Sequence, residues 1–486
     1  MKRTLLLITL VFLMASPALG LNPPEDPLTL FPQPKENELL LYIEFENMPF
    51  WVNILEGKWV NDFMTNLGKV KKEELVAFHL FTGTLRSFVK EASIMIYSEA
   101  ENLTSLDTKR VLEKGRPFLI LYTKQNPMSI AKALNINFKK EGKIYKFELE
   151  KGRKSYALMG ENYVILAKKR DLERLLNPFR TKLAKAWNLK STSPIPTGSK
   201  GELYIFVKLP ESGNINQESV EVFGRSEEKA FVLETLVKER KDSSATITPR
   251  PLYSPIPGKG KPLLLTALPI DGKALLDLLK KNLSQDATTG ILFSLSLTEE
   301  EFIKLLTGRL YFIIGGEAKV LGLPIKGLYL YFISDLPNEE LSPLFKRVMN
   351  VAMRNYSLEK TLKINEQSGW DILYRSEPST DLIIGLKGQD IFIGVTSIEN
   401  LNHKMEIPEQ VEKLFMEANL PFLYLNIKEL RAGLESLEPL IKSLSGEEEA
   451  KEFNKVKYVI PPWQEIIARS FNQKRGEIRI IYQDED

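Results

Sequence analysis

The two histidines are the first residues to test for chemistry, because the chain contains only His79 and His403 and no cysteine. A nucleophilic triad or a zinc site in a cysteine-free chain needs at least one histidine with suitable Ser, Asp or Glu partners. His79 lies in the apolar run VAFHLF, and His403 lies in the polar segment LNHKM. We therefore expect His79 to be a partly buried helix residue and His403 to be solvated. The missing thiols exclude disulfides and cysteine catalysis.

Carboxylates are plentiful, with acidic clusters at residues 299–301 and 447–449. A glycosidase-like pair of carboxylates stays open on inventory alone. Both clusters, however, stand where the first turn of a helix favours negative charge. The sequence has no P-loop, no dinucleotide-binding glycine pattern, no HExxH motif and no calcium loop. We therefore expect no cofactor and no metal, and this inventory does not favour an enzyme.

Three aromatic residues form the candidate ligand or partner surface, Phe50, Trp51 and Trp59, all in one predicted helix. Rings of this kind are favoured in apolar ligand grooves and in protein interfaces. The alternative is that they pack on the sheet of their own half. The matching helix of the second half, ALLDLLKKNL, has an ordinary leucine stripe. That difference leads us to favour packing over a binding surface.

A recurring hairpin pattern organises the chain around these residues. YALMGENYVILA at residues 156–167 is similar to IGLKGQDIFIGV at residues 384–395, about half a chain length later. In each, a Gly followed by acidic and amide residues separates two apolar runs, which is typical of a β-hairpin. We expect Gly160 and Gly388 to hold the positive φ of a tight turn. Gly83 and Gly308, in the matched FTGTL and LTGRL, are expected to end helices and launch strands.

Other matched segments predict the fold class. The strands ELLLYIEF and PLLLTAL each open a half. The helix after the first strand is expected to begin near Met48 and run on through Trp59, and Asp271 is expected to cap the helix after the second. Thr298 and Glu301 form a capping box. The order of elements predicts an α+β protein of two tandem similar domains from an internal duplication, each a largely antiparallel sheet covered by helices.

The N-terminus predicts export. Lys2 and Arg3 precede an apolar core at residues 5–14 and a small-residue end at residues 18–20, a pattern too short to span a bilayer. The alternative is a retained anchor. We assign residues 1–20 to a signal peptide, 21–37 to an extended leader, 38–240 to the first repeat, 241–261 to a Pro/Gly/Ser-rich linker and 262–486 to the second repeat. We expect a periplasmic or extracellular protein with no transmembrane helix in its mature chain.

The overall charge gives no sign of a strongly charged partner. A formal net charge of +3, spread over an evenly mixed sequence, gives no reason to expect nucleic acid or an anionic membrane as partner. A protein of the cell envelope or an apolar ligand is the expected partner.

The signal peptide, the similar halves, the hairpins at Gly160 and Gly388 and the apolar strand after Gly308 resemble an uncharacterised family of exported bacterial proteins that carry a domain of unknown function. That resemblance implies an extracytoplasmic, non-enzymatic role and brings no functional residues with it. Three hypotheses follow. The first is a binding or structural module of the cell envelope that acts through a protein-binding surface or cleft. The second is a carrier of a hydrophobic small molecule or lipid, and the third is an envelope hydrolase with paired carboxylates.

Overall fold

The computed structural model describes residues 27–482, except residues 33, 36, 67–71, 100–114, 134–138, 151–152, 177–201, 210–216, 240–247, 284, 356, 359–361, 377–378, 449, 451–452, 454–459, 462 and 473. The chain divides into two compact units. The first comprises Met1–Asp242 with Ser436–Pro461, and the second comprises Ser243–Glu435 with Pro462–Asp486. The predicted signal peptide lies outside the described residues.

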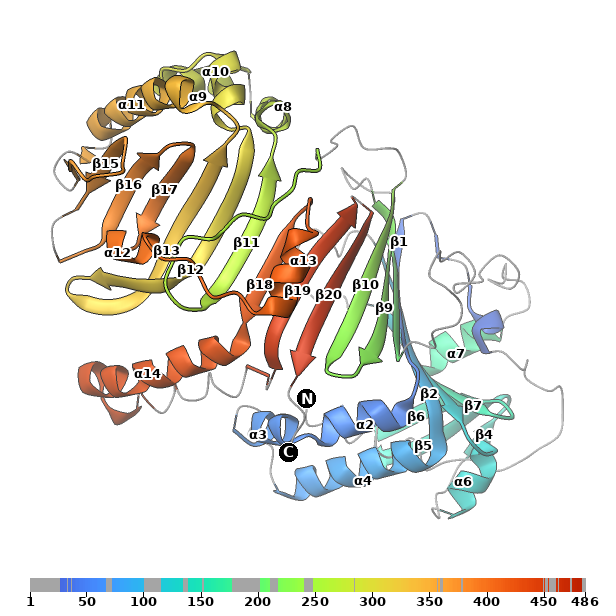
Figure 1. The fold of residues 1–486 in the computed structure, drawn as a ribbon. Helices are drawn as coiled ribbons and strands as arrows, with labels where there is room; N and C mark the ends of the chain where they lie inside the picture. The colour runs from blue at the N-terminus through green and yellow to red at the C-terminus, as the bar shows by residue number, and fades with distance from the viewer. Residues whose placement is uncertain are drawn as a thin grey trace. The chain divides into compact units, whose positions relative to one another are not determined.

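An antiparallel sheet forms the framework of the first unit (Figure 1). Its described strands are β1 (Glu38–Phe45), β2 (Val89–Glu99), β3 (Arg116–Thr123), β4 (Lys139–Glu141), β5 (Ile144–Glu150), β6 (Arg153–Met159), β7 (Tyr163–Leu166), β8 (Leu203–Lys208), β9 (Gln217–Glu227) and β10 (Ala230–Glu239). They pair in the order β4-β5-β6-β7-β3-β2-β1-β8-β9-β10. The described helices are η1 (Pro27–Leu30), α2 (Met48–Glu56), α3 (Lys58–Asn66), α4 (Lys72–Phe88), α6 (Pro127–Ala133) and α7 (Lys169–Leu175).

The second unit has a sheet with the same strand order. Its described strands are β11 (Pro262–Ile270), β12 (Gly308–Val320), β13 (Leu323–Ser334), β14 (Lys363–Ile364), β15 (Ile372–Arg375), β16 (Leu382–Lys387), β17 (Asp390–Val395), β18 (Phe422–Asn426), β19 (Trp463–Asn472) and β20 (Arg475–Tyr482). They pair as β14-β15-β16-β17-β13-β12-β11-β18-β19-β20. Helices in this part of the chain are α8 (Gly272–Asn282), α9 (Gln285–Ser294), α10 (Glu299–Leu305), α11 (Asn338–Asn355), α12 (Ile398–Leu401), α13 (Glu409–Met416) and α14 (Ile427–Ser445). The predicted α+β class with largely antiparallel sheets is confirmed.

Local helix signals in the second unit act as the sequence predicts. The Asp271 carboxylate accepts hydrogen bonds from the backbone N–H groups of Lys273 and Ala274, which satisfies two otherwise unpaired donors of α8. Thr298 and Glu301 form a complete capping box at the start of α10. These caps fix where both helices begin, and therefore where they cover the sheet.

The four singled-out glycines serve different purposes. Both hairpins exist, β6–β7 and β16–β17, but only Gly388 has a positive φ, of 63°. At Gly160 the prediction was wrong: a Cβ there would lie 2.3 Å from the Tyr163 ring, so close packing requires the glycine. Gly308 also lacks a positive φ, and its Cβ would lie 2.2 Å from the Ile333 carbonyl oxygen on β13. Gly83 lies inside α4 rather than at a helix end.

Further predictions also need correction. The first helix is interrupted at Gly57, which ends α2 before α3 starts. His79 is exposed on α4 rather than partly buried, whereas His403 is solvent-exposed as expected. Part of the predicted leader packs into the first unit, where Phe31 is fully buried. Residues 248–261, placed in a linker by the sequence, pack into the second unit through Leu252 and Ile256.

Among the described residues, no helix is both long and apolar enough to cross a membrane.

Candidate functional site

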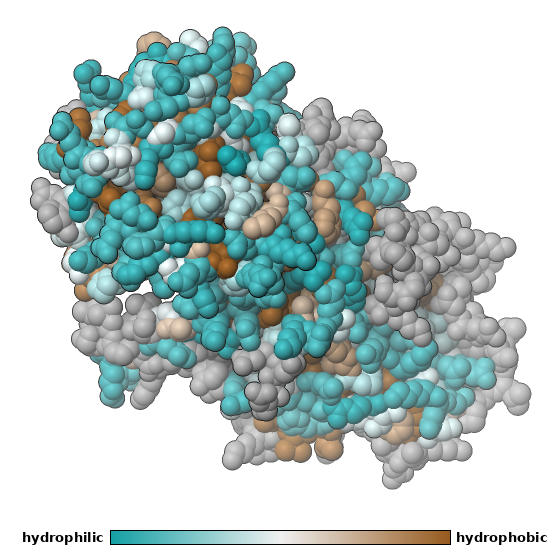
Figure 2. Space-filling view, in the orientation of Figure 1, coloured by the Kyte–Doolittle hydropathy of each residue, from teal (hydrophilic) through white to brown (hydrophobic). Residues whose placement is uncertain are grey.

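The two faces of the sheet in the second unit differ in what covers them. On one face, residues Leu252 and Ile256 and helix α13 pack against inward-pointing tyrosines and aliphatic side chains, including Tyr311 and Tyr424. Figure 1 shows residues 248–261, α12 and α13 lying over the strands on this face. Hydrophilic residues predominate on the surface seen from the same side (Figure 2). This face is therefore a closed core.

The opposite face of the same sheet carries apolar side chains that remain accessible. Because strand side chains alternate between faces, residues paired across neighbouring strands form rows. One row is Ile480, Ile466, Leu425, Leu264, Ile314, Leu328 and Val395. The next row is Ile478, Ala468, Leu423, Thr266, Phe312, Leu330 and Ile393. We call these two rows the aliphatic face.

Every residue of the aliphatic face is half-buried or exposed. The most accessible are Leu328 at 45%, Ile393 at 42% and Leu330 at 36%. They lie on interior strands, where a sheet face is normally covered by another layer. Contiguous apolar surface of this kind marks a binding site in a soluble protein.

Helices border the aliphatic face at two of its ends. At one end, Phe302 of α10 and Phe345 of α11 pack with Phe332 and Ile391, the strand residues directly beyond the second row. At the other end, α14 begins right after β18, and Asn426 accepts a hydrogen bond from the Glu429 backbone N–H at 2.9 Å. Thus the aliphatic face lies between the α8–α11 layer and the start of α14.

The first unit has a matching pair of rows. The first is Val237, Val220, Val207, Leu41, Ile96 and Pro117, and the second is Thr235, Val222, Ile205, Ile43, Ile94 and Leu119. Apart from the buried Ile96, these residues are half-buried. Helices α2 and α4 cover the adjoining end of the sheet, where Val52 of α2 and Phe78 of α4 share a core with Ala92 of β2. Both units therefore present an apolar sheet face with a helical layer at one end.

Helix α2 places two of the sequence-predicted aromatic residues against the first sheet. The Trp51 indole N–H donates to the Glu202 carbonyl oxygen at 2.7 Å. Its ring contacts Phe45 and Phe231, with centroids 5.2 and 5.8 Å away. Phe50 stacks on Phe231 at 5.7 Å. Trp59 lies separately on α3, half-buried. Phe50 and Trp51 therefore brace α2 on its own sheet.

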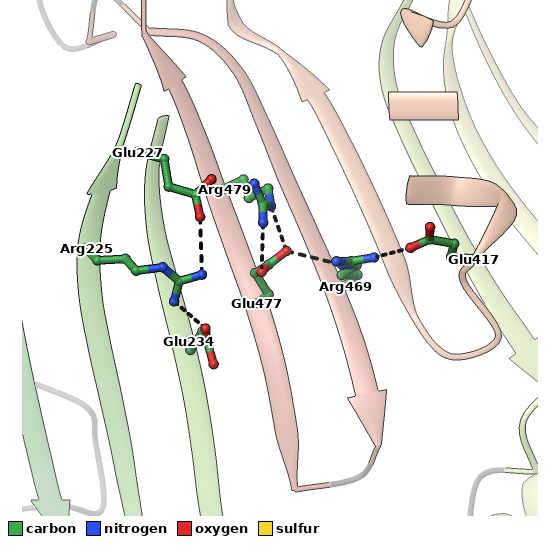
Figure 3. Close-up of polar contacts among 7 residues, drawn as sticks. All are labelled: Arg225, Glu227, Glu234, Glu417, Arg469, Glu477 and Arg479. Atoms are coloured by element: carbon green, nitrogen blue, oxygen red, sulfur yellow. Dashed lines mark hydrogen bonds and ion pairs between the residues drawn. The ribbon is translucent and has the colours of Figure 1, made fainter. Parts of the chain in front are cut away.

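Charged pairs lie on the last two strands of each unit (Figure 3). In the first unit, Arg225 on β9 pairs with the buried Glu234 on β10, and with Glu227 at 3.2 Å. In the second unit, Arg469 on β19 contacts Glu417 at 3.1 Å and the buried Glu477 at 3.2 Å. Because side chains alternate along a strand, the last two strands of each unit carry charged side chains on one face and aliphatic side chains on the other.

The pKa values of two carboxyl groups are raised, those of the buried Glu221 and the half-buried Asp390. Burial raises the pKa of Glu221, while a hydrogen bond from the Tyr204 hydroxyl at 3.1 Å acts in the opposite direction. Burial likewise raises the pKa of Asp390, opposed by a hydrogen bond from Tyr331. Each carboxyl group is held by a tyrosine of its own sheet.

Within the described part of the chain, no cluster of three or more His, Asp or Glu side chains is placed to hold a metal ion.

Comparisons with known proteins add little. No family model and no curated protein match the chain. Crystal forms I, IV and III of TP0453 align with it at 12%, 10% and 10% sequence identity, with TM-scores of 0.24, 0.22 and 0.25. The alignments cover 44%, 43% and 46% of this chain and 78%, 80% and 83% of the TP0453 chain. Similarity at these TM-scores supports no inference about function.

The sequence did not identify the aliphatic face. Alternation of apolar residues along each strand was visible in it, but alternation looks the same whether or not another layer covers that face.

Proposed function

We propose that the protein is an exported, non-enzymatic carrier of an apolar ligand with a long hydrocarbon chain, such as a lipid, and that the ligand lies on the aliphatic face. The observation that carries this proposal is the pair of continuous rows, apolar except for Thr266, across β20, β19, β18, β11, β12, β13 and β17. The signal-like N-terminus supports export, and the strand order common to the two units supports an internal duplication.

The chemistry of the rows favours a hydrocarbon chain over a protein. Thr266 is the polar member of the two rows, and Phe312 is the aromatic one. Cores of protein interfaces are instead enriched in Tyr, Trp and Arg. A hydrocarbon chain needs no hydrogen bonds, and each buried CH₂ group contributes about 0.8 kcal/mol.

The dimensions of the rows also suit an extended chain. Neighbouring strands lie about 4.8 Å apart, so a row that crosses from β20 to β17 is about 29 Å long. A hydrocarbon chain that lies between the two rows would contact Leu328 and Leu330 on one strand and Leu423 and Leu425 on another. Shape and chemistry therefore point to the same ligand class.

The test is binding of a fluorescent long-chain fatty acid to the mature protein, with Leu328→Asn/Leu330→Asn as the variant. Both side chains are already accessible, so polar replacement should leave the fold intact. We expect at least about tenfold weaker binding, since each leucine loses apolar contact with the ligand. Ile364→Thr is the matched control, because Ile364 is 74% exposed and lies outside the two rows.

Native mass spectrometry of protein purified from its own host is the second readout. A co-purifying lipid that the double variant no longer retains would support the carrier. Lack of any fatty-acid binding, combined with lipid-free protein and a stoichiometric protein partner, would refute it in favour of the protein-binding module.

A further inference from the structure

The turn that joins β12 to β13 presents aliphatic side chains to solvent. Leu321 is 79% exposed, Leu323 is 51% exposed and Ile325 is 40% exposed. We call these three residues the apolar wedge. Strand β13 continues from the wedge directly to Leu328 and Leu330 of the aliphatic face.

The backbone at the tip makes its leucine unexpected. Val320 pairs with Leu323, so Leu321 and Gly322 form a two-residue turn in which both φ angles are positive, 53° and 81°. Such turns strongly prefer Asn, Asp or Gly, because positive φ disfavours other side chains. A leucine at this position is unfavourable for two reasons. Its side chain conflicts with the positive φ, and its apolar surface is exposed to water. Strained residues that persist in a fold are a sign of function.

A neighbouring loop holds the wedge in place. The Leu321 N–H donates to the Thr380 hydroxyl at 3.2 Å, and the Gly322 N–H donates to the Ser379 carbonyl oxygen at 2.7 Å. The Lys319 N–H donates to the Asp381 carboxylate at 2.8 Å. These three hydrogen bonds hold the backbone of the turn while its leucines remain exposed. The wedge is therefore preorganised for contact with something outside the second unit.

We propose that the apolar wedge inserts into the interfacial region of a lipid bilayer. Three aliphatic side chains are too few for the roughly 1,200 Å² that a stable protein interface buries, but they suit partition into a membrane surface. Charges of both signs flank the wedge, because Lys326 lies 3.8 Å from Glu429 and pairs across the hairpin with Glu317. Contact with the bilayer therefore depends on the apolar side chains.

Membrane contact by the wedge goes beyond ligand binding. Because side chains alternate along β13, Leu323 and Ile325 project from the same face as Tyr329 and Tyr331, opposite to Leu328 and Leu330. The wedge is therefore a contact surface distinct from the two rows of the aliphatic face.

The test is flotation of the full mature protein with vesicles of phosphatidylcholine and phosphatidylglycerol, compared with the variant Leu321→Asn/Leu323→Thr. Asn tolerates positive φ better than Leu, so the variant should fold at least as well. We expect at least about a tenfold loss of vesicle binding in the variant, because two aliphatic side chains no longer partition into the bilayer. Ile364→Thr should bind vesicles like the wild type.

Three outcomes would overturn the proposal: a wild type that does not float with vesicles, a wedge variant that floats equally well, or an equal loss in Ile364→Thr. The fatty-acid assay separates this proposal from the carrier function. The wedge variant should still bind free fatty acid, whereas Leu328→Asn/Leu330→Asn should still float. Loss of both activities in the wedge variant would contradict a separate membrane contact.

Discussion

Replacing Glu477 by Gln should strongly destabilise the β19–β20 hairpin of the second unit (Figure 3). Glu477 is 5% exposed and accepts hydrogen bonds from Arg469 Nε at 3.2 Å and from Arg479 Nε at 2.8 Å. The neutral amide would leave two guanidinium groups, 15% and 25% exposed, without their shared carboxylate. Removing one partner of a buried ion pair costs about 3–5 kcal/mol, and the partial exposure of the arginines places this case near 3 kcal/mol.

Glu417 provides a matched control on the same arginine. It lies 3.1 Å from Arg469 but is 58% exposed. Solvent screens such a pair, so Glu417→Gln should cost no more than about 1 kcal/mol. The two substitutions remove the same chemical group, and only burial and the number of partners distinguish them.

Hydrogen exchange read by mass spectrometry is the appropriate assay, because a chain of two units need not unfold in a single transition. Peptides covering residues 463–482 should exchange more than a hundredfold faster in Glu477→Gln, since each 1.4 kcal/mol is a factor of ten. The same peptides in Glu417→Gln should change by about fivefold or less. Equal effects of the two substitutions would refute the argument from burial.

Two glycines and one helix cap give further predictions. Gly388→Ala should destabilise the β16–β17 hairpin by about 1 kcal/mol through positive φ, and Gly388→Asn by less, as measured by hydrogen exchange. Gly160→Ala should destabilise β6–β7 by steric conflict with the Tyr163 ring, so Gly160→Asn should bring no recovery; a recovery would contradict the packing explanation. Burial acts to raise the pKa of Asp271, but hydrogen bonds from Ala274 and Lys273 lower it overall. Its stabilising effect is therefore present above its unfolded pKa of about 3.9 and is lost as the pH falls through the lower folded value. The melting temperature should favour the wild type over Asp271→Asn at pH 6, and that gap should shrink below about pH 4; a gap independent of pH would contradict this.

Local signals in the sequence were sufficient to predict many of the strands and helix starts. The runs ELLLYIEF and PLLLTAL are β1 and part of β11, and the caps at Asp271 and Thr298 begin α8 and α10. Each of these predictions depends on neighbours within a few residues. Short-range preferences of strands, turns and caps are therefore enough to place them.

Predictions failed where distant residues decide the outcome. Gly160 is required by a tyrosine ring, which a turn pattern cannot reveal. Gly308 begins β12 after α10 as expected, but a neighbouring strand rather than a positive φ requires the glycine. Strand β9 was missed because Glu alternates with Val in it, and β19 was missed because Glu465 and Arg469 flank a short apolar run at residues 466–468. The candidate site depends on two rows whose residues stay half-buried or exposed among the described residues, and that property belongs to the assembled sheet alone.

The strand order has a consequence for how the protein reaches its native state. In each unit the earliest strand lies in the interior of the sheet: Leu40 of β1 pairs with Lys208 of β8, and Leu264 of β11 pairs with Leu425 of β18. A chain is made from its N-terminus, so β1 and β11 must wait for partners encoded far downstream. Pairings of such high contact order fold slowly and leave apolar strand edges open to aggregation in the meantime. Efficient production of this protein should therefore depend on a factor that shields β1 and β11 until the later strands arrive.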